Sequence, residues 1–203
     1  MARIHPTAQV DAFVQAAQAL LPVRYPSIAS TDYTSIIDQR SFDRLCEALD
    51  DARARGARVV QLVPGPAFDA ATRKIAPCIV LDAPPDSILW QREIFGPILP
   101  IRGYTQLETV VDAVNAGPRP LAIYPFSHDA RTVQMLLDRV MSGGVSVNDA
   151  LFHVGQHDLP FGGVGASGMG HYHGREGFLD FSHVRSVYKA GAPDPRREWG
   201  MLP

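Results

Sequence analysis

The segment from Glu93 to Pro97 combines a carboxylate, an aromatic side chain and a turn within a short stretch of sequence. A carboxylate can accept hydrogen bonds from the paired hydroxyls of a ribose, and the face of Phe95 could pack against a flat heterocycle. Gly96 and Pro97 predict a turn before the apolar run that follows them. On residue types alone, a solvated Glu93 and a core Phe95 are the simpler interpretation, and a nucleotide contact is the alternative.

A second unusual segment runs from Leu159 to Gly170 and is rich in glycine. Glycine lets a backbone pass close to a ligand or to another chain segment, because no Cβ intervenes. Gly163, Gly165 and Gly168 match the G-x-G-x-x-G spacing of dinucleotide loops, but no strand is predicted before them and no Lys-Ser/Thr follows. As an isolated nucleotide motif the segment therefore has little specificity.

The chain contains two cysteines, Cys46 and Cys78, and a cysteine thiolate can act as a nucleophile. Cys46 falls on the apolar side of a predicted helix and Cys78 within a predicted strand. Neither has a neighbouring base or a helix N-terminus that would lower its pKa. Their wide separation, without a C-x-x-C pattern, indicates reduced structural thiols rather than a disulfide framework.

Five histidines within a short C-terminal stretch raise the possibility of a metal site, because imidazole is a common zinc ligand. They are His153, His157, His171, His173 and His183. No cysteine or carboxylate pattern completes a tetrahedral set, so we predict metal-free loop histidines. A histidine-based metal-binding module stays a less favoured alternative.

The composition of the 203-residue chain, with 46% hydrophobic and 20% charged residues, is that of a soluble globular protein. A formal net charge of -2 gives no field suited to rows of phosphates, so nucleic acid is not an expected partner. No apolar run approaches the roughly 20 residues that cross a bilayer, and the start lacks the apolar core of a signal peptide. We therefore expect a cytoplasmic protein that has no membrane partner.

Hydrophobic periodicity predicts helices alternating with strands, and hence an α/β fold with a mixed or mostly parallel sheet flanked by helices. Helices are predicted over 8–21, 41–55, from 105 onward and over 129–141. Strands are predicted over 57–63 (buried), 74–84, 97–104, 121–127 and 144–149. We expect Pro22 to end the first helix, Pro77 to make its strand an edge or give it an irregular start, and Thr105 with Glu108 to form a capping box. A long loop rich in glycine and histidine should then extend to about Gly177.

Taken together, these motifs resemble the aldehyde dehydrogenase family, whose signature has E-x-F-G-P before a strand, then S-G-x-V-x-V-N, P-F-G-G and S-G-x-G. The corresponding segments are 93–97, 142–148, 161–163 and 167–170. The similarity runs from about Val10 to Lys189 and is nearest to the class 3 and coniferyl aldehyde dehydrogenase branch. It implies a catalytic-domain portion over 1–190 and a tail over 191–203.

The resemblance also assigns roles to single residues. Glu93 would hold the hydroxyls of the nicotinamide ribose, and Phe95 would pack beside the nicotinamide of NAD or NADP. Phe161 would line the aldehyde pocket. Phe152 and His153 would belong to its outer part, where this branch accommodates aromatic or long-chain aldehydes.

The family reaction oxidises an aldehyde to a carboxylic acid and needs a cysteine thiolate, an oxyanion site, a hydride acceptor and a glutamate base. By resemblance, the cysteine, the glutamate, an oxyanion asparagine and the Rossmann domain would all precede Val10, and residues 1–9 contain no cysteine. We therefore expect no catalytic residue in this chain, no cofactor bound by it alone and no activity in isolation. The choice between NAD and NADP would belong to the Rossmann part of the parent enzyme.

A non-catalytic interaction domain is the other alternative. Without a cofactor domain, apolar surface that is normally covered between domains would be bare, and such patches drive association. We therefore expect a homo-oligomer or an aggregation-prone chain.

Overall fold

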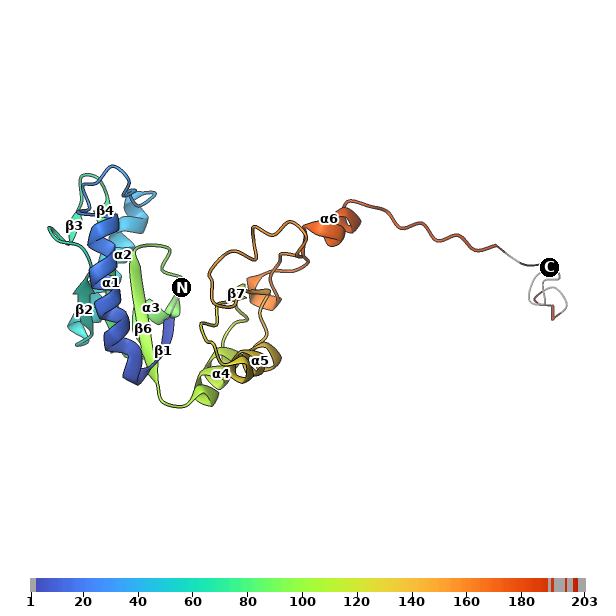
Figure 1. Cartoon of the computed structure of the whole chain (residues 1–203). Coiled ribbons are helices and arrows are strands. Elements are labelled where there is room, and N and C mark those ends of the chain that lie inside the picture. The colour runs from blue at the N-terminus through green and yellow to red at the C-terminus, as the bar shows by residue number, and fades with distance from the viewer. Residues whose placement is uncertain (1–2, 190, 192–195, 197–198, 201–203) are drawn as a thin grey trace. The chain divides into compact units, whose positions relative to one another are not determined.

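A computed structural model describes residues 3–189, 191, 196 and 199–200 (Figure 1). The chain divides into two compact units, Met1–Val110 and Val111–Pro203. The tail predicted over 191–203 lies mostly outside the described residues, and the boundary at residue 190 stays a prediction. Among the described helices, none is long and apolar enough to cross a membrane.

The first unit is built on a four-stranded mixed sheet with the strand order β1-β6-β5-β2. These strands are β1 (Arg3–Pro6), β2 (Arg58–Gln61), β5 (Cys78–Leu81) and β6 (Ile98–Tyr104). β1 and β5 both run parallel to β6, whereas β2 pairs antiparallel with β5. The predicted α/β fold with a mixed sheet is confirmed.

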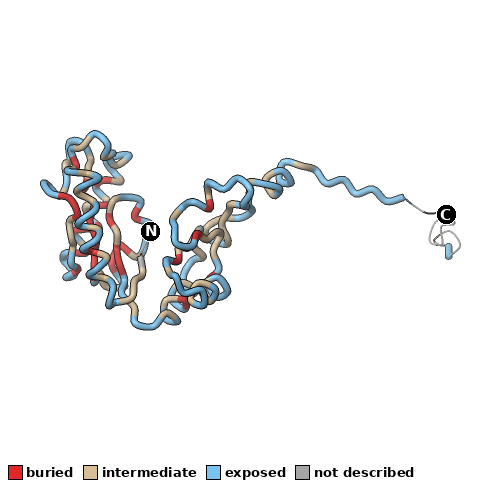
Figure 2. Tube along the Cα trace, viewed as in Figure 1, coloured by how far each residue is buried: buried red, intermediate tan, exposed pale blue. Residues whose placement is uncertain are grey.

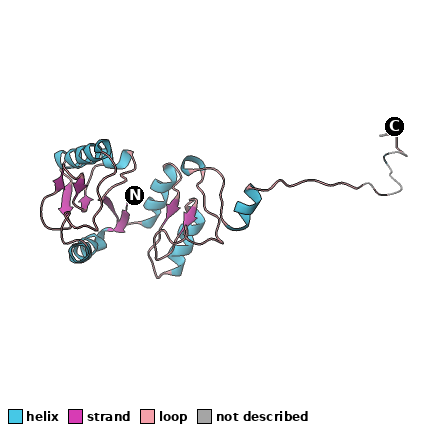
Figure 3. Ribbon diagram, turned by 90° about the horizontal axis from the view of Figure 1, so that it is seen from above, coloured by secondary structure: helices cyan, strands magenta, loops and turns pink. Residues whose placement is uncertain are grey.

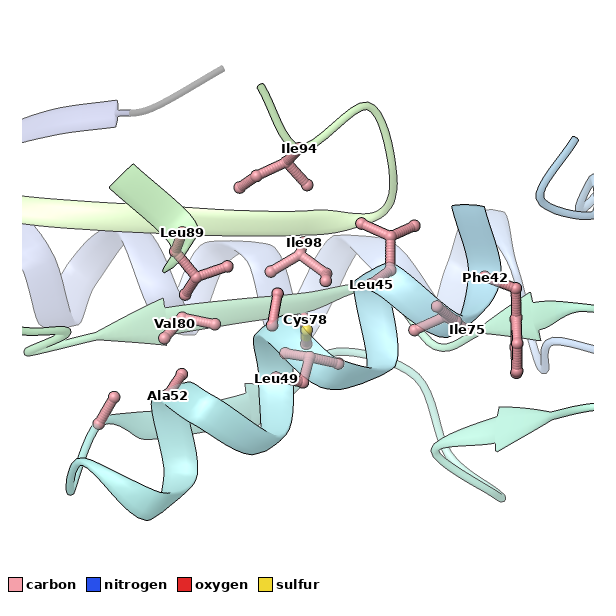
Figure 4. Packing of buried hydrophobic residues seen from close by; sticks show 12 residues of the cluster. Phe42, Leu45, Leu49, Ala52, Ile75, Cys78, Val80, Leu89, Ile94 and Ile98 are labelled. Atoms are coloured by element: carbon pink, nitrogen blue, oxygen red, sulfur yellow. The ribbon is translucent and has the colours of Figure 1, made fainter. Parts of the chain in front are cut away.

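Helices α1 (Val10–Arg24) and α2 (Gln39–Ala54) pack against opposite faces of this sheet (Figure 3). The central strand β5 contributes to both helix contacts, because successive side chains of a strand point to opposite faces of the sheet. Cys78 and Val80 join the core cluster of α2 (Figure 4), whereas Ile79 and Leu81 join the cluster of α1. Two apolar layers therefore enclose the centre of the sheet.

The first helix continues past the residue that was expected to end it. α1 contains Pro22 and runs on to Arg24, where the N–H of Tyr25 donates to the Leu21 carbonyl at 2.8 Å. Proline removes the hydrogen bond to the carbonyl four residues earlier, here that of Gln18. Gln18 is exposed, so water can satisfy that carbonyl, and a proline this close to the helix end is tolerated.

One strand prediction was wrong in detail. The strand expected to be buried, β2, is a half-exposed edge strand, whereas β5 is central and fully buried. Of the two alternatives given for Pro77, an edge strand or an irregular start, the structure has the irregular start, because Pro77 separates β5 from a small hairpin. That hairpin consists of β3 (Phe68–Asp69) and β4 (Lys74–Ile75), and two short helices, η1 (Thr7–Gln9) and α3 (Ile88–Gln91), complete the unit.

The second unit has short strands and several helices. They are α4 (Leu107–Ala116, beginning in the first unit), β7 (Ala122–Ile123), α5 (Ala130–Arg139), β8 (Gly144–Val145), η2 (Gly165–Ser167) and α6 (Gly174–Asp180). The parallel pair β7 and β8 is shorter than predicted, because Pro125 has no N–H with which to extend the ladder.

Two further local predictions were wrong. Gln106, not Thr105, immediately precedes the first residue of α4, so the helix begins one position later than the expected capping box requires. The expected loop that ends near Gly177 contains η2 and the start of α6.

Candidate functional site

Glu93 and Phe95 lie in the loop between α3 and β6, and each is exposed. Ile94, between them, is 4% exposed and packs in the same core cluster as Leu45 and Ile98 (Figure 4). The loop is therefore anchored by its middle residue, which leaves the two predicted cofactor residues accessible to a ligand.

The backbone of Phe95 is in the left-handed region, with φ of +50°, and its ring is 80% exposed. A bulky residue is uncommon there, because the conformation costs about 1–3 kcal/mol, and such strain clusters at functional sites. The interpretation of Phe95 as a core residue is wrong. A strained and exposed aromatic ring is better suited to contacting a ligand.

The end of the loop is fixed by close packing. A Cβ on Gly96 would lie 2.6 Å from Leu45 Cδ1, so only glycine fits between the loop and α2 without movement of Leu45. The Cys78 N–H donates to the Pro97 carbonyl at 3.0 Å, which joins the loop to the start of β5.

A hollow of about 400 Å³ lies beside this loop, and Glu93 and Phe95 both contribute to its lining. Its other walls are largely apolar and include Leu21, Leu62 and Pro77. The volume falls within the roughly 300–1,000 Å³ of small-molecule sites. An accepting carboxylate next to an exposed ring and apolar walls fits a ribose that carries a flat heterocycle, as in NAD or NADP.

Neither cysteine is placed to act as a nucleophile. Cys78 is 4% exposed, and burial raises the pKa of its thiol to about 12. Burial also raises the pKa of Cys46, and the nearby carboxylates of Asp50 and Asp43 raise it further. Both thiols therefore stay protonated near neutral pH, which agrees with their interpretation as structural residues.

The second unit holds two of the predicted aldehyde-pocket residues, His153 and Phe161, in an aromatic cluster around Phe161. The Phe161 ring lies 6.0 Å from His153, 5.7 Å from Tyr172 and 6.2 Å from His173, measured between ring centroids. Tyr124 lies 6.0 Å from His153 on the same measure. Sequence reasoning missed Tyr124, because it belongs to a segment that was interpreted only as an apolar strand.

His153 is only 8% exposed and is held by Ser146. Its backbone N–H donates to Ser146 Oγ at 3.2 Å, and its Nδ1 lies 3.0 Å from the same oxygen. Which of the two atoms donates in the second contact depends on the tautomer of the His153 ring. Nε2 has no hydrogen-bond partner among the described residues, and a Cβ on Gly144 would lie 2.6 Å from it.

Phe152 differs from its neighbour His153 in burial, because its side chain is 67% exposed. An exposed aromatic residue next to a buried one is compatible with the rim of an apolar site. The structure thus brings His153 and Phe161 together, while Phe152 remains at the surface of the second unit. Their assignment to an aldehyde pocket stays a prediction.

The glycine-rich segment packs against the chain itself. A Cβ on Gly143 would collide with the carbonyl oxygen of Gly162, and one on Gly162 with that of Gly170. A Cβ on Gly163 would overlap the backbone of Ser167. The close approach that glycine permits is therefore used, at least in part, for backbone packing.

Asn148, which ends the S-G-x-V-x-V-N segment, also has a structural role. Its side chain accepts from the Ser127 N–H at 2.8 Å and donates to the Ser127 carbonyl at 3.0 Å. Its φ of +56° is a conformation that asparagine tolerates better than most residues. This part of the motif joins the end of the β8 segment to the chain before α5.

The five loop histidines can be compared with the metal site that their number suggested. No group of three or more His, Cys, Asp or Glu side chains arranged to hold a metal ion occurs within the described part of the chain. His157 and His173 are neighbours, with ring centroids 5.9 Å apart, whereas His171 and His183 are exposed.

Known proteins match almost the whole chain. Residues 3–187 match the aldehyde dehydrogenase family. A probable coniferyl aldehyde dehydrogenase from Caulobacter vibrioides is 45% identical over 98% of this chain and 41% of its own length. A coniferyl aldehyde dehydrogenase from a Pseudomonas species is 45% identical over 90% of this chain and 38% of its own length.

A solved structure supports the same relationship. The substrate-bound state of Staphylococcus aureus AldH superimposes with a TM-score of 0.84 and 33% identity, over 97% of this chain and 43% of that chain. This chain therefore spans about two fifths of the length of the proteins that it matches.

Proposed function

Because the chain belongs to the aldehyde dehydrogenase family, we propose that it carries part of the cofactor and aldehyde sites of an NAD(P)-dependent enzyme that oxidises an aldehyde to a carboxylic acid. One observation carries this proposal: Glu93 and Phe95 are exposed beside a common hollow, and the Phe95 backbone is held in a strained conformation. A structural turn would not need the exposed aromatic ring.

The roles of the two residues follow from their chemistry. The Glu93 carboxylate accepts hydrogen bonds from the ribose hydroxyls, and the exposed Phe95 ring covers one side of the nicotinamide. When bound, NAD or NADP supplies the hydride acceptor of the reaction. The chain's own contribution is therefore to orient the nicotinamide half of the cofactor.

We propose an aromatic aldehyde as the substrate. Two relatives of similar identity carry the name coniferyl aldehyde dehydrogenase. The aromatic cluster around Phe161 and the exposed Phe152 offer apolar surface that suits a flat ring.

We also propose that this chain is inactive by itself. Both of its cysteines have raised pKa values, so it has no thiolate ready to attack an aldehyde near neutral pH. Cytoplasmic location stays a prediction.

The first test is an NAD(P)+ reduction assay on the purified chain with benzaldehyde and with a long-chain aldehyde. We expect no turnover above the blank. Turnover that disappears in a Cys46→Ser, Cys78→Ser double variant would instead make one of these cysteines the nucleophile.

The second arm of the assay adds the part of a full-length relative that this chain does not cover. We expect turnover when the chain is refolded with the part of the Caulobacter vibrioides relative that precedes the matched region. Turnover should fall by about 100-fold with Glu93→Gln if the carboxylate orients the cofactor. Equal turnover of Glu93→Gln and the unchanged chain would remove Glu93 from the site.

A non-catalytic interaction domain is the second candidate, and the exposed apolar side chains of the second unit favour it. Five of the most exposed are Met169, Phe178, Phe181, Val184 and Tyr188. Surface of this kind marks sites of association. This candidate predicts association of the chain without turnover in either arm of the assay.

A further inference from the structure

The guanidinium of Arg44, in α2, contacts the backbone of the loop that carries Glu93 and Phe95. Its Nη2 donates to the Ile94 carbonyl at 2.8 Å, and its Nη1 donates to the Glu93 carbonyl at 3.5 Å. We propose that Arg44 is a positioning residue that fixes this loop in its ligand-accepting conformation. The inference deepens the proposed function and rests on it for the identity of the ligand.

Arg44 contacts carbonyl groups although carboxylates lie nearby. Asp43 and Glu47 line the same surface hollow as Arg44, together with Arg40 and Arg92. Within the described residues, Arg44 forms no ion pair. A guanidinium that is not paired with a carboxylate can hold two adjacent carbonyls at once, because its donors form a rigid planar fork.

These two carbonyls directly precede the strained residue, Phe95, in the chain. The peptide group between Ile94 and Phe95 determines φ of Phe95, and the Ile94 carbonyl is part of that group. A donor fixed on this oxygen therefore limits rotation of the peptide and opposes relaxation of the left-handed backbone. Arg44 thus acts on the direction of the Phe95 ring without touching a ligand.

Neighbouring contacts fix the loop elsewhere. Ile94 is buried in the core, and Gly96 lies against Leu45, the residue next to Arg44 in α2. Neither contact holds the carbonyls of Glu93 and Ile94. Among the described residues, Arg44 is the side chain that donates to these two oxygens.

The test compares two variants, Arg44→Met and Arg44→Lys, with a control, Arg40→Met. The control removes an exposed arginine that lies one turn earlier in α2. Hydrogen–deuterium exchange of the whole chain is followed in peptides that cover 92–98. We expect the loop amides of Arg44→Met to exchange at least several-fold faster, those of Arg44→Lys to be intermediate, and those of Arg40→Met to be unchanged. Peptides from β5 and β6 should keep their protection in all three variants.

The same variants are then assayed in the refolded two-part enzyme. We expect Arg44→Met to raise KM for NAD+ several-fold while KM for benzaldehyde stays constant, since the loop contacts the cofactor side only. A purely structural role would lower the active fraction, and so kcat, without changing either KM.

Unchanged exchange of the loop in both Arg44 variants would overturn the positioning role. If Arg44→Met does not fold, Arg44→Lys keeps the charge and the aliphatic stem and decides the comparison. If exchange rises as expected but the unchanged two-part enzyme shows no turnover with NAD+ or NADP+, the positioning role stands and the proposed function fails.

Discussion

At the scale of single residues, the pairing of Ser146 with His153 gives a direct prediction. Ser146→Ala removes the partner of both the His153 backbone N–H and its Nδ1, in a place where both residues are 8% exposed. Leaving buried polar groups without partners costs about 1–3 kcal/mol, so we expect the free energy of unfolding to fall by roughly that amount. Urea unfolding of the chain would measure it.

Ser186→Ala, at an exposed serine in the same unit, is the control for this substitution. Its urea midpoint should equal that of the unchanged chain. Equal midpoints for Ser146→Ala and Ser186→Ala would show that the Ser146 hydroxyl is not needed to keep His153 buried.

At the scale of elements, α2 begins at a cap that depends on charge. Asp38 accepts from the Ser41 N–H at 2.7 Å, and this hydrogen bond lowers the pKa of its carboxyl group. A depressed pKa in the folded state means that the cap stabilises the fold above the ordinary value of 3.8 and that this stabilisation is lost as the pH falls below it.

We therefore expect Asp38→Ala to lower Tm by a few degrees at pH 7, because Ala cannot cap the helix, and to lower it by less at pH 3, where part of the Asp38 charge is lost. Asp38→Asn should keep most of the cap at pH 7, because its side-chain oxygen still accepts the bond. Calorimetry at both pH values measures the difference. An Asp38→Ala deficit that is the same at pH 3 and pH 7 would contradict a charge-dependent cap.

The elements of the first unit could largely be predicted from the sequence, and those of the second unit less well. The apolar periodicity of α1 and α2 indicates the faces that pack on the sheet. The burial of β5 was harder to predict, because a proline such as Pro77 favours an edge strand. Only the observed strand pairing shows that Pro77 precedes the paired residues of β5. α6 escaped prediction because Gly174 and Gly177 suggest a loop.

The candidate site was predicted in part. Glu93 and Phe95 could be found because they are adjacent and because the motif resembles a known family. Arg44 and Tyr124 could not, since nothing in the local sequence indicates that either residue would contact a distant segment.

At the scale of the whole molecule, burial is divided unevenly between the two units (Figure 2). Among the described residues after 110, Val111 and Val140 are the only buried members of the Val, Leu, Ile, Phe and Met class. The first unit has a continuous core on both faces of its sheet. The second unit thus gains less stabilisation from apolar burial.

This imbalance predicts that the isolated chain associates through the second unit. Light scattering should show oligomers or aggregates, and a dye for apolar surface should bind. The double variant Phe178→Ser, Phe181→Ser removes side chains that are 73% and 95% exposed and should lower the associated fraction. Val23→Ser, at a 79% exposed position of the first unit, should not. A monomer that binds no dye would contradict the prediction.

The close packing of Gly143, Gly162 and Gly163 against neighbouring backbone has a consequence for how sequence change in this chain should be interpreted. Because any side chain at these positions would overlap main-chain atoms, a descendant that had lost all activity would still have to keep the three glycines in order to fold. Their retention in a lineage would record selection on folding and could not be used to argue that its members oxidise aldehydes.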